Sequence, residues 1–478
     1  MNRRYWLFVS FCISLITWAD AIAEDEVIRW NQQAVVTMKD AASSPPKASR
    51  DLAIIHVAIF DALNSIDKLY TPIYAPWQPY SEPIDPNVVI AAAAKRTLSE
   101  LYPAFTSDFN DLMAVTLSTA ESAIAADNAI ALGESVADII LAWRATDGWD
   151  AESDYVYDDT IPGNWRPSLP NYDPPIEPQW ADLLPFGMSD VNLYMPPPPP
   201  ALDSLEYADA FNEVKYIGSS DDSVRTDDQN QITEFWNDFP GTTASPAGKW
   251  NIIAQVITDQ FNLNLIDNAR AFALVNIALA DAGIIAWRSK YVYDLWRPID
   301  AIRLADTDGN PETIADPNWL PSWPSPAFPE YVSGHSTFSA AGAEMLASIV
   351  GTNDVNFSVS VGFGVLPGVY RSFDTIWAAA EEAGQSRIYG GIHFQFANIE
   401  GLNSGQDISV DLYDQYCLNN PCDLNRDNTV DFSDFVFLCE DWMYIEADSQ
   451  RISSDINYDR CVDYIDFAIL AETLINHN

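Results

Sequence analysis

Three separate stretches of this sequence carry residue types that could bind a small oxyanion and move protons around it. The residues concerned are Lys290, Arg297, Ser333, Gly334, His335, Arg387 and His393. Arginine offers forked donors in one plane, lysine offers a point charge, and glycine lets a backbone N–H approach closely. One imidazole can attack or ligate the central atom while the other moves protons. The set therefore suits a tetrahedral or trigonal-bipyramidal oxyanion.

The order and spacing of these residues add information. The order is Lys290, six residues, Arg297-Pro298; then Ser333-Gly334-His335; then Ser386-Arg387, three residues, Gly391, one residue, His393. This order resembles the K-x6-RP, PSGH and SR-x3-G-x-H pattern shared by vanadium-dependent haloperoxidases and the related acid and lipid phosphatases. The resemblance implies an all-α fold of packed helical bundles with the anion site at one end.

The same resemblance implies a role for each residue. The implied roles are charge balance by Lys290, Arg297 and Arg387, hydrogen bonding by Ser333 and the Gly334 N–H, a bond to the central atom from His393, and acid–base chemistry by His335.

Two enzymatic interpretations follow from the resemblance. In the first, the anion is vanadate, hydrogen peroxide binds with help from His335, Lys290 polarises it, and halide attacks to give hypohalous acid. In the second, the substrate is a phosphate ester, and His393 forms a phosphohistidine while His335 protonates the leaving alcohol. Trp296 and Phe328, expected beside the pocket, look more like the haloperoxidases, so we favour the first interpretation.

Three features depart from the family pattern. Val332 replaces the proline of PSGH, and Ala397 stands four residues after His393, where the phosphatases often carry Asp. We therefore expect Asn398 or a backbone carbonyl to orient His393. The acid that should support an arginine has no clear place in the sequence, and Asp281 is our candidate.

Helical periodicity dominates the stretches that must position these residues. The expected helices cover 27–66, 88–101, 109–143, 204–217, 232–239, 249–267, 269–287, 336–350 and 373–383. His335 would then begin a helix, where free N–H groups favour an anion. Residues 150–200 are rich in Pro, Trp, Tyr and Asp and predict a long loop packed over the site. His56 is expected to be a core residue, because it stands alone on an apolar face.

Composition and charge limit the classes of partner. The chain has 478 residues, 48% of them hydrophobic, and a formal net charge of −45, which would repel nucleic acid and anionic membranes. We take the acidity as a means of solubility in a salty exterior. Residues 1–23 combine a basic start, a short apolar run and an Ala-x-Ala exit, as in a secretory signal. We therefore expect a secreted protein, extracellular, at the cell surface or in a periplasm, without another apolar run long enough to span a membrane.

The last sixty or so residues repeat an oxygen-rich loop followed by an apolar helix, and the second loop begins 32 residues after the first. The candidate calcium ligands are Asp423, Asn425, Asp427, Thr429, Asp431 and Asp434, then Asp455, Asn457, Asp459, Cys461, Asp463 and Asp466. Five side-chain oxygens and a backbone carbonyl make an EF-hand-like Ca²⁺ shell. The repeat resembles a dockerin module, which implies docking to a cohesin-like scaffold. Asn428 and Arg460 replace the usual glycine, so the Arg460 loop departs further from the pattern.

Residues 24–416 would thus form a catalytic domain and residues 417–478 a small loop–helix calcium domain. Cysteines occur in the mature chain only near its end, at positions 417, 422, 439 and 461, and predict up to two disulfides whose pairing stays open. A third interpretation is a non-catalytic, calcium-dependent docking protein, but it does not explain the cations around His393. The halide, the organic substrate and the oligomeric state stay open.

Overall fold

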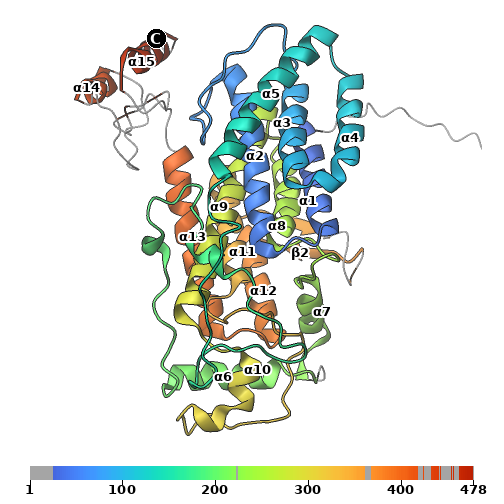
Figure 1. Ribbon diagram of the computed structural model, residues 1–478, viewed down its shortest axis with the longest axis vertical. Helices are drawn as coiled ribbons and strands as arrows, with labels where there is room; N and C mark the ends of the chain where they lie inside the picture. Colours follow the sequence, from blue (N-terminus) through green and yellow to red (C-terminus); the bar gives the residue numbers. More distant parts are fainter. Residues whose placement is uncertain are drawn as a thin grey trace, which may run out of the picture.

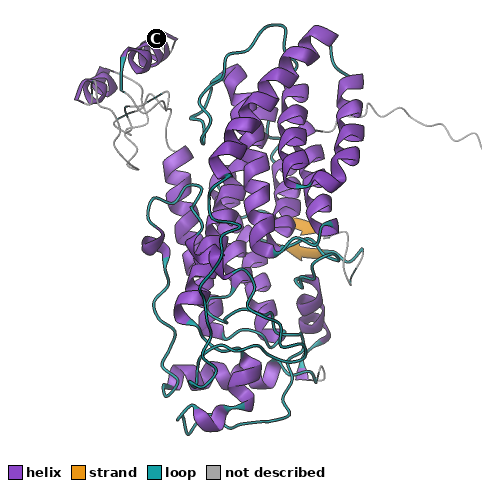
Figure 2. Cartoon of the chain, viewed as in Figure 1, coloured by secondary structure: helices purple, strands orange, loops and turns teal. Residues whose placement is uncertain are grey.

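The computed structural model describes residues 25–221, 224–360, 366, 368–417, 424, 432–440, 442, 454, 456 and 462–476. Within these residues the chain is mainly α-helical, as predicted, and forms one two-stranded sheet (Figures 1 and 2). The first helices are α1 (Glu26–Asp40), α2 (Pro45–Asp67), α3 (Pro86–Leu101), α4 (Thr106–Ser118), α5 (Ala123–Arg144), α6 (Leu205–Ile217), α7 (Asp227–Phe235) and α8 (Pro246–Gln260). The later helices are α9 (Leu265–Tyr293), α10 (Pro298–Arg303), α11 (Gly334–Val350), α12 (Ile376–Tyr389), α13 (Gln395–Cys417), α14 (Phe432–Glu440) and α15 (Tyr464–Asn476).

Short elements connect these helices. They are the 3₁₀ turns η1 (Pro103–Phe105), η2 (Pro178–Asp182), η3 (Val191–Tyr194) and η5 (Ala305–Thr307), and the antiparallel strands β1 (Phe357–Val359) and β2 (Arg371–Phe373). The strands have three residues each, too few for an alternating pattern to show in the sequence.

Helix α9 joins two groups of helices. It packs against α2, which packs in turn against α3 and α5, and it also packs against α11, which contacts α12 and α13. Its Ala-rich sequence is buried on almost all sides. The helix is long and apolar enough to cross a membrane, so our expectation of no such run was wrong, but 94% of its most apolar window is buried inside the bundle.

Close packing of α11 on α13 sets the position of the Ser333 stretch. A Cβ at Gly405 would lie 2.2 Å from the carbonyl oxygen of Thr337, so only glycine allows this approach. The N–H of Ser333 donates to the carbonyl of Ala397 at 3.0 Å. The start of α11, in the second motif stretch, is therefore held against the start of α13, which follows the third motif stretch.

Several helix boundaries differ from the predicted ones. Residues 27–66 form two helices rather than one, because Pro45 begins α2 with Ser44 as its N-cap. Residues 109–143 also divide, and Ser122 caps the second helix. The helix predicted at 232–239 is α7, which starts earlier because Thr226 and Gln229 form a capping box.

The predicted loop over the site is present between α5 and α6. The N–H of Ile176 donates to the carbonyl of Ala327 at 2.9 Å, and its carbonyl accepts from the hydroxyl of Tyr291 at 2.6 Å. The loop thus covers the residue that precedes Phe328. His56 is fully buried, as predicted, and its Nε2 lies 2.9 Å from Asn31 Oδ1.

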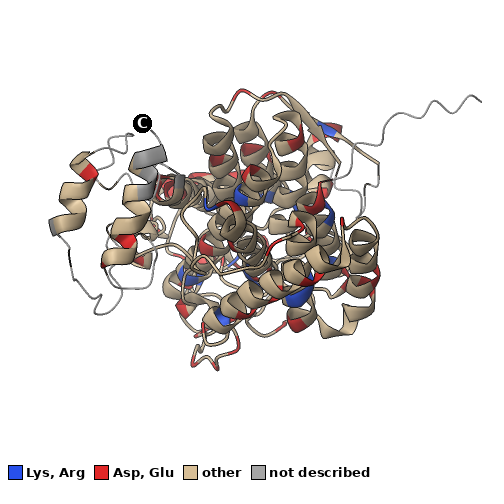
Figure 3. Ribbon diagram, turned by 90° about the horizontal axis from the view of Figure 1, so that it is seen from above, with Lys and Arg blue, Asp and Glu red and all other residues tan. Residues whose placement is uncertain are grey.

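Acidic residues are spread over the helices seen in Figure 3, while Lys and Arg are sparse. Seven Lys and Arg residues of the described chain are buried, and Lys290, Arg297 and Arg387 are three of them. Burial of such a charge is costly unless an anion or polar groups compensate it. Because these three belong to the motif stretches, they mark the place to look for a site.

Candidate active site

Lys290 lies in the last turn of α9 and is fully buried. Its Nζ donates to the carbonyl of Glu330 at 3.1 Å and to the carbonyl of Val332. Burial and the neighbouring Arg297 lower the pKa of Lys290 well below its usual value. The lysine is therefore held against the backbone that leads into Ser333, with its charge poorly compensated.

Arg297 caps α10, and Pro298 follows it in the first helical position. Its Nε donates to the carbonyl of Phe328 at 2.8 Å and its Nη1 to the carbonyl of Ile392 at 2.9 Å. Nη1 also lies 3.2 Å from His393 Nε2. The remaining nitrogen, Nη2, is buried without a hydrogen-bond partner. A buried charged donor without a partner is expensive, so it indicates a place for an anion.

The ring of Phe328 forms a wall beside both cations. Its centroid lies 5.1 Å from Lys290 Nζ and 4.7 Å from Arg297 Cζ, within cation–π range. Trp296 is placed differently: it is fully buried in the apolar cluster around Tyr207, and its N–H donates to the Tyr207 hydroxyl at 3.0 Å. Trp296 therefore supports the segment that carries Arg297 and gives no polar group to the site.

His393 follows the turn after α12 and is buried beside Arg297. Its Nδ1 lies 2.8 Å from Glu330 Oε1. Because a carboxylate only accepts, Nδ1 carries the proton, and Nε2 keeps its lone pair. Burial, with Arg297 and Lys290, lowers the pKa of His393 well below its usual value, so the imidazole is neutral. Nε2 accepts from Arg297 Nη1 at 3.2 Å, and a neutral ring with this unprotonated nitrogen is what a bond to a central atom requires.

Gly391 makes the turn that brings His393 into place. It has φ of +75°, and a Cβ there would lie 2.1 Å from the carbonyl oxygen of Gly218. Both facts exclude any other residue without rearrangement. The glycine of the third motif stretch therefore has a backbone role.

His335 is the second residue of α11, so it lies at a helix N-terminus as predicted. Its Nε2 is 3.1 Å from the carbonyl oxygen of Trp236, which can only accept. The proton is therefore on Nε2, and Nδ1 is the basic atom. Burial, then Arg387 and Lys249, lowers the pKa of His335 well below its usual value and keeps the ring neutral.

Ser333 caps α11, and its hydroxyl is fully buried. Its Oγ lies 2.8 Å from Ser336 Oγ, which lies 2.7 Å from Asn398 Oδ1. Gly334 is the first residue of the helix, so its N–H has no intrahelical acceptor. A hydroxyl and a backbone N–H are thus available side by side at the N-terminus of α11.

Arg387 lies in the last turn of α12 and is buried. Its Nη1 is 3.5 Å from the Trp236 carbonyl that also faces His335, and its Nε has no partner. Burial lowers the pKa of Arg387 to about 10, against the opposing charge of Asp238.

These contacts bring all seven predicted residues into one buried, cationic region. Two arginine nitrogens without partners, a serine hydroxyl and a helix N-terminus are the donors that an oxyanion needs. An unprotonated imidazole nitrogen, His393 Nε2, adds a group that can bond a central atom. The donor set therefore fits vanadate, and it equally fits the phosphoryl group.

Comparison with known proteins agrees with this geometry. Residues 270–418 match the model of the VCPO second helical-bundle domain. The vanadium chloroperoxidase of Curvularia inaequalis is 25% identical over 468 residues, which cover 75% of this chain and 76% of that protein. The chain is thus similar to the vanadium haloperoxidases.

Solved structures of two vanadium-dependent haloperoxidases are also similar to the chain. The crystal structure of the first bacterial vanadium-dependent iodoperoxidase is similar with a TM-score of 0.72 and 26% identity, covering 81% of this chain and 95% of that one. The holo form of a bacterial vanadium-dependent chloroperoxidase has a TM-score of 0.62 at 17% identity, covering 80% of this chain and 95% of that one, and shows the shared fold.

Two of our expectations for this vanadium haloperoxidase fold were wrong. His393 is oriented by Glu330, whereas Asn398 contacts Ser336. Asp281 does not support an arginine of the site, because its carboxylate accepts the backbone N–H groups of residues 186–188 at 2.6–2.9 Å. Glu330 could have been noticed, since it is the one acidic residue in the motif stretch 328–335.

Asp238 and Lys249 are the site residues that the sequence did not reveal. Asp238 is partly buried and lies near both Lys249 and Arg387. Lys249, on α8, donates from Nζ to the carbonyl of Asn237. Burial lowers the pKa of Lys249 to about 7, opposed by Asp238. Neither residue lies in a motif stretch, so only the fold brings them to Arg387.

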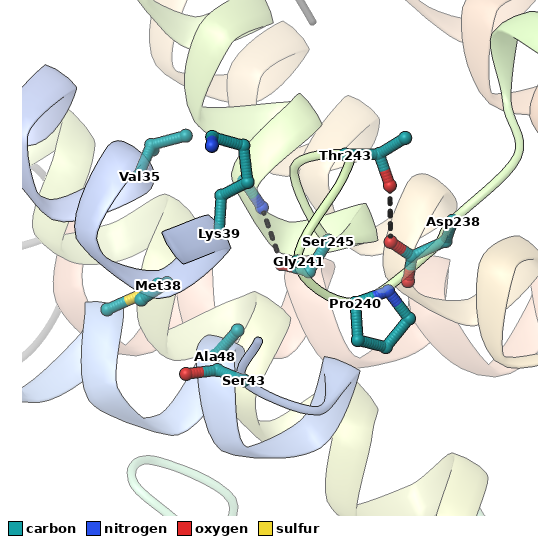
Figure 4. A pocket seen from close by; sticks show the side chains of 11 residues that line it. Val35, Met38, Lys39, Ser43, Ala48, Asp238, Pro240, Gly241, Thr243 and Ser245 are labelled. Carbon is teal, nitrogen blue, oxygen red and sulfur yellow. Dashed lines mark hydrogen bonds between the residues drawn. The ribbon is translucent and has the colours of Figure 1, made fainter. Parts of the chain in front are cut away.

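The loop of Asp238 also borders a small pocket between α1, α2 and α8 (Figure 4). Asp238 accepts from the hydroxyl of Thr243 at 3.0 Å, as the figure shows. The pocket volume is about 10 Å³, about the space that one water needs. The pocket therefore has no room for a substrate.

The C-terminal repeat is described only in part. Of the twelve candidate calcium ligands, Asp434, Asp463 and Asp466 are described, and the other nine lie outside the described residues, as do the signal segment 1–23, Cys422 and Cys461. Asp466 is buried and accepts the N–H groups of Ile456 and Asp463 at 2.7 and 2.8 Å. Among the described residues no group of three or more His, Cys, Asp or Glu is placed to hold a metal ion. Cys439 is exposed and has no disulfide within the described chain.

Proposed function

We propose that this chain is a secreted vanadium-dependent haloperoxidase that oxidises halide with hydrogen peroxide at a vanadate bound by His393. One observation carries the proposal. His393 Nε2 carries no proton and accepts from Arg297 Nη1 at 3.2 Å, while Arg297 Nη2 and Arg387 Nε are buried without a partner. The family relatives named as chloroperoxidase and iodoperoxidase support the choice of chemistry.

The residues that would hold the anion divide into two groups. Lys290, Arg297 and Arg387 balance its negative charge, while Ser333 and the N–H of Gly334 donate hydrogen bonds at the helix N-terminus. Bound vanadate would supply a Lewis acid that activates hydrogen peroxide toward attack by halide. The buried position of these groups excludes water and strengthens each electrostatic contact.

His335 moves the proton in this proposal. With Nε2–H bonded to the Trp236 carbonyl, Nδ1 takes the proton of the incoming peroxide. The lowered pKa of His335 keeps Nδ1 unprotonated and ready to accept. Lys290, with two of its N–H groups on carbonyls, keeps a third for the peroxide.

The test uses the purified mature protein freed of vanadate. Added orthovanadate, with peroxide and bromide, is expected to start bromination of a phenolic dye, and His393→Ala is expected to abolish it. Bromination that ignores added vanadate contradicts the proposal. Hydrolysis of p-nitrophenyl phosphate that vanadate blocks, without bromination, assigns the phosphatase activity instead.

We propose further that residues 1–23 direct export and that the C-terminal repeat binds Ca²⁺ and docks to a cohesin-like scaffold. The spacing of the candidate ligands supports this, together with the burial of Asp434 and Asp466. Addition of Ca²⁺ to the full chain treated with a chelator is expected to raise protection of residues 432–476 from hydrogen exchange. Unchanged exchange refutes the calcium site, and secretion is checked by the N-terminal residue of the protein recovered outside the cell.

A further inference from the structure

Glu330 is buried between two motif stretches and is held on both sides by its own backbone. Its N–H donates to the carbonyl of Leu295 at 2.8 Å, and its carbonyl accepts from Lys290. The residue is fully inaccessible to solvent. The backbone position of Glu330 is therefore fixed by hydrogen bonds to the segment before Arg297 and to the end of α9.

The carboxylate makes two contacts with the His393 segment and leaves one oxygen over. Oε1 lies 2.8 Å from His393 Nδ1 and accepts the N–H of Phe394 at 2.8 Å. Oε2 is buried without a partner. A carboxylate is expensive to bury, so a purely structural contact would be met more cheaply by a neutral acceptor. Burial raises the pKa of Glu330 to about 7, opposed by the Phe394 N–H, Arg297 and Lys290, so the charge itself is expected to matter above that pH.

We propose that Glu330 is a positioning residue for the proposed vanadate site: its carboxylate fixes the proton and the ring orientation of His393, so that Nε2 presents its lone pair to vanadium. This inference rests on the proposed function. A carboxylate behind a ligating histidine orients the ring and raises its basicity. At the opposite edge of the ring, Arg297 Nη1 lies 3.2 Å from Nε2 and donates to the lone pair that vanadium would use.

The carboxylate has a second, opposing effect, and this separates the proposal from simple charge balance. Glu330 reduces the positive potential that Lys290 and Arg297 create for any anion. Removal of its charge should therefore strengthen binding of an anion held only by electrostatics, such as sulfate. The same removal should weaken binding of vanadate, because that ion needs the bond from His393. Positioning and charge balance thus predict opposite signs.

The experiment compares Glu330→Gln with the wild-type protein, both freed of vanadate. Orthovanadate and sulfate are titrated separately by calorimetry, and the ⁵¹V NMR shift of bound vanadate is recorded. We expect the Gln variant to bind vanadate about 10- to 100-fold more weakly, with an altered ⁵¹V shift, and to bind sulfate as tightly as wild type or more tightly. Vanadate affinity that is unchanged, or that rises with sulfate affinity, overturns the inference.

Two further variants keep the result decisive. Glu330→Asp keeps the charge and withdraws it by one methylene, so it should weaken the binding of vanadate without strengthening the binding of sulfate. This comparison remains possible even if the Gln variant fails to fold. Glu330→Ala should bind vanadate more weakly than Glu330→Gln, because glutamine retains an acceptor for the Nδ1–H of His393. Failure of the wild-type protein to bind vanadate would overturn the proposed function itself, a result that differs from a loss confined to the variants.

Discussion

Replacement of Arg297 by lysine would test whether a fork of donors, rather than charge alone, binds the anion. Arg297 uses Nε for the carbonyl of Phe328 and Nη1 for the carbonyl of Ile392, and Nη2 remains for the anion. A lysine carries the same charge on one nitrogen and cannot reach all three places. The substitution therefore removes at least one charge-assisted hydrogen bond to the anion.

The expected size of the loss follows from that bond. A hydrogen bond to a charged group contributes about 1.5–3 kcal/mol, and each 1.4 kcal/mol is about a tenfold change in Kd. Arg297→Lys should therefore weaken orthovanadate about 10- to 150-fold. Calorimetric titration at constant ionic strength measures it. Arg96→Lys is the matched control, because Arg96 pairs with Asp138 and Glu100 at the surface. A Kd for Arg297→Lys within threefold of that control would refute the reasoning.

The remaining predictions concern residues around the site. Lys249→Met removes a cation that lowers the pKa of His335, so that pKa should rise and the acidic limb of the pH–rate profile should move to higher pH. Asp281→Asn cannot accept three backbone N–H groups, so the free energy of unfolding should fall by about 3 kcal/mol. The melting temperature should fall with it, with little change in vanadate affinity. Ser336→Ala removes the hydroxyl 2.8 Å from Ser333 Oγ, and loss of about 1 kcal/mol should lower kcat about fivefold.

Exposed or partly exposed positions provide controls for these three variants. Lys95→Met, Asp182→Asn and Ser118→Ala make the same chemical changes away from the site. If Lys249→Met moves the acidic limb to lower pH, or gives the same limb as Lys95→Met, then the charge of Lys249 does not lower the pKa of His335. Unchanged melting of the Asp281 variant would exclude its role as a loop anchor, and unchanged kcat of the Ser336 variant would exclude support of Ser333.

The sequence was sufficient for the fold class and for the seven motif residues, because both depend on local patterns. Apolar periodicity marks helices, and the motif spacing marks residues that chemistry needs together. It was not sufficient for Asp238 and Lys249, which are near Arg387 only because α8 and α12 pack around the same helix, α11. The orientation of His393 failed for the same reason: Glu330 precedes it by 63 residues. The pairing of residues so far apart carries no signal in a single sequence, although Glu330 is the one acidic residue of the motif stretch 328–335.

Helix boundaries failed for a more local reason. Apolar spacing continues across residues 41–44, so the break depends on Pro45, which begins α2, and Ser44 is its N-cap without a side-chain hydrogen bond to the helix. The start of α7 depends instead on the reciprocal hydrogen bonds of Thr226 and Gln229. These bonds stabilise a polar first turn that apolar spacing does not mark as helical. Caps therefore carried information that periodicity did not.

One oxygen atom links two parts of the chemistry. The carbonyl of Trp236 faces both Nε2 of His335 and Nη1 of Arg387, and a carbonyl has two lone pairs for two donors. A shift of either side chain changes the geometry of the hydrogen bond that this carbonyl makes with the other side chain. A double-mutant cycle on the two residues should therefore be non-additive. A substitution of His335 or Arg387 that changes the pH dependence of activity should therefore also change the affinity for the cofactor.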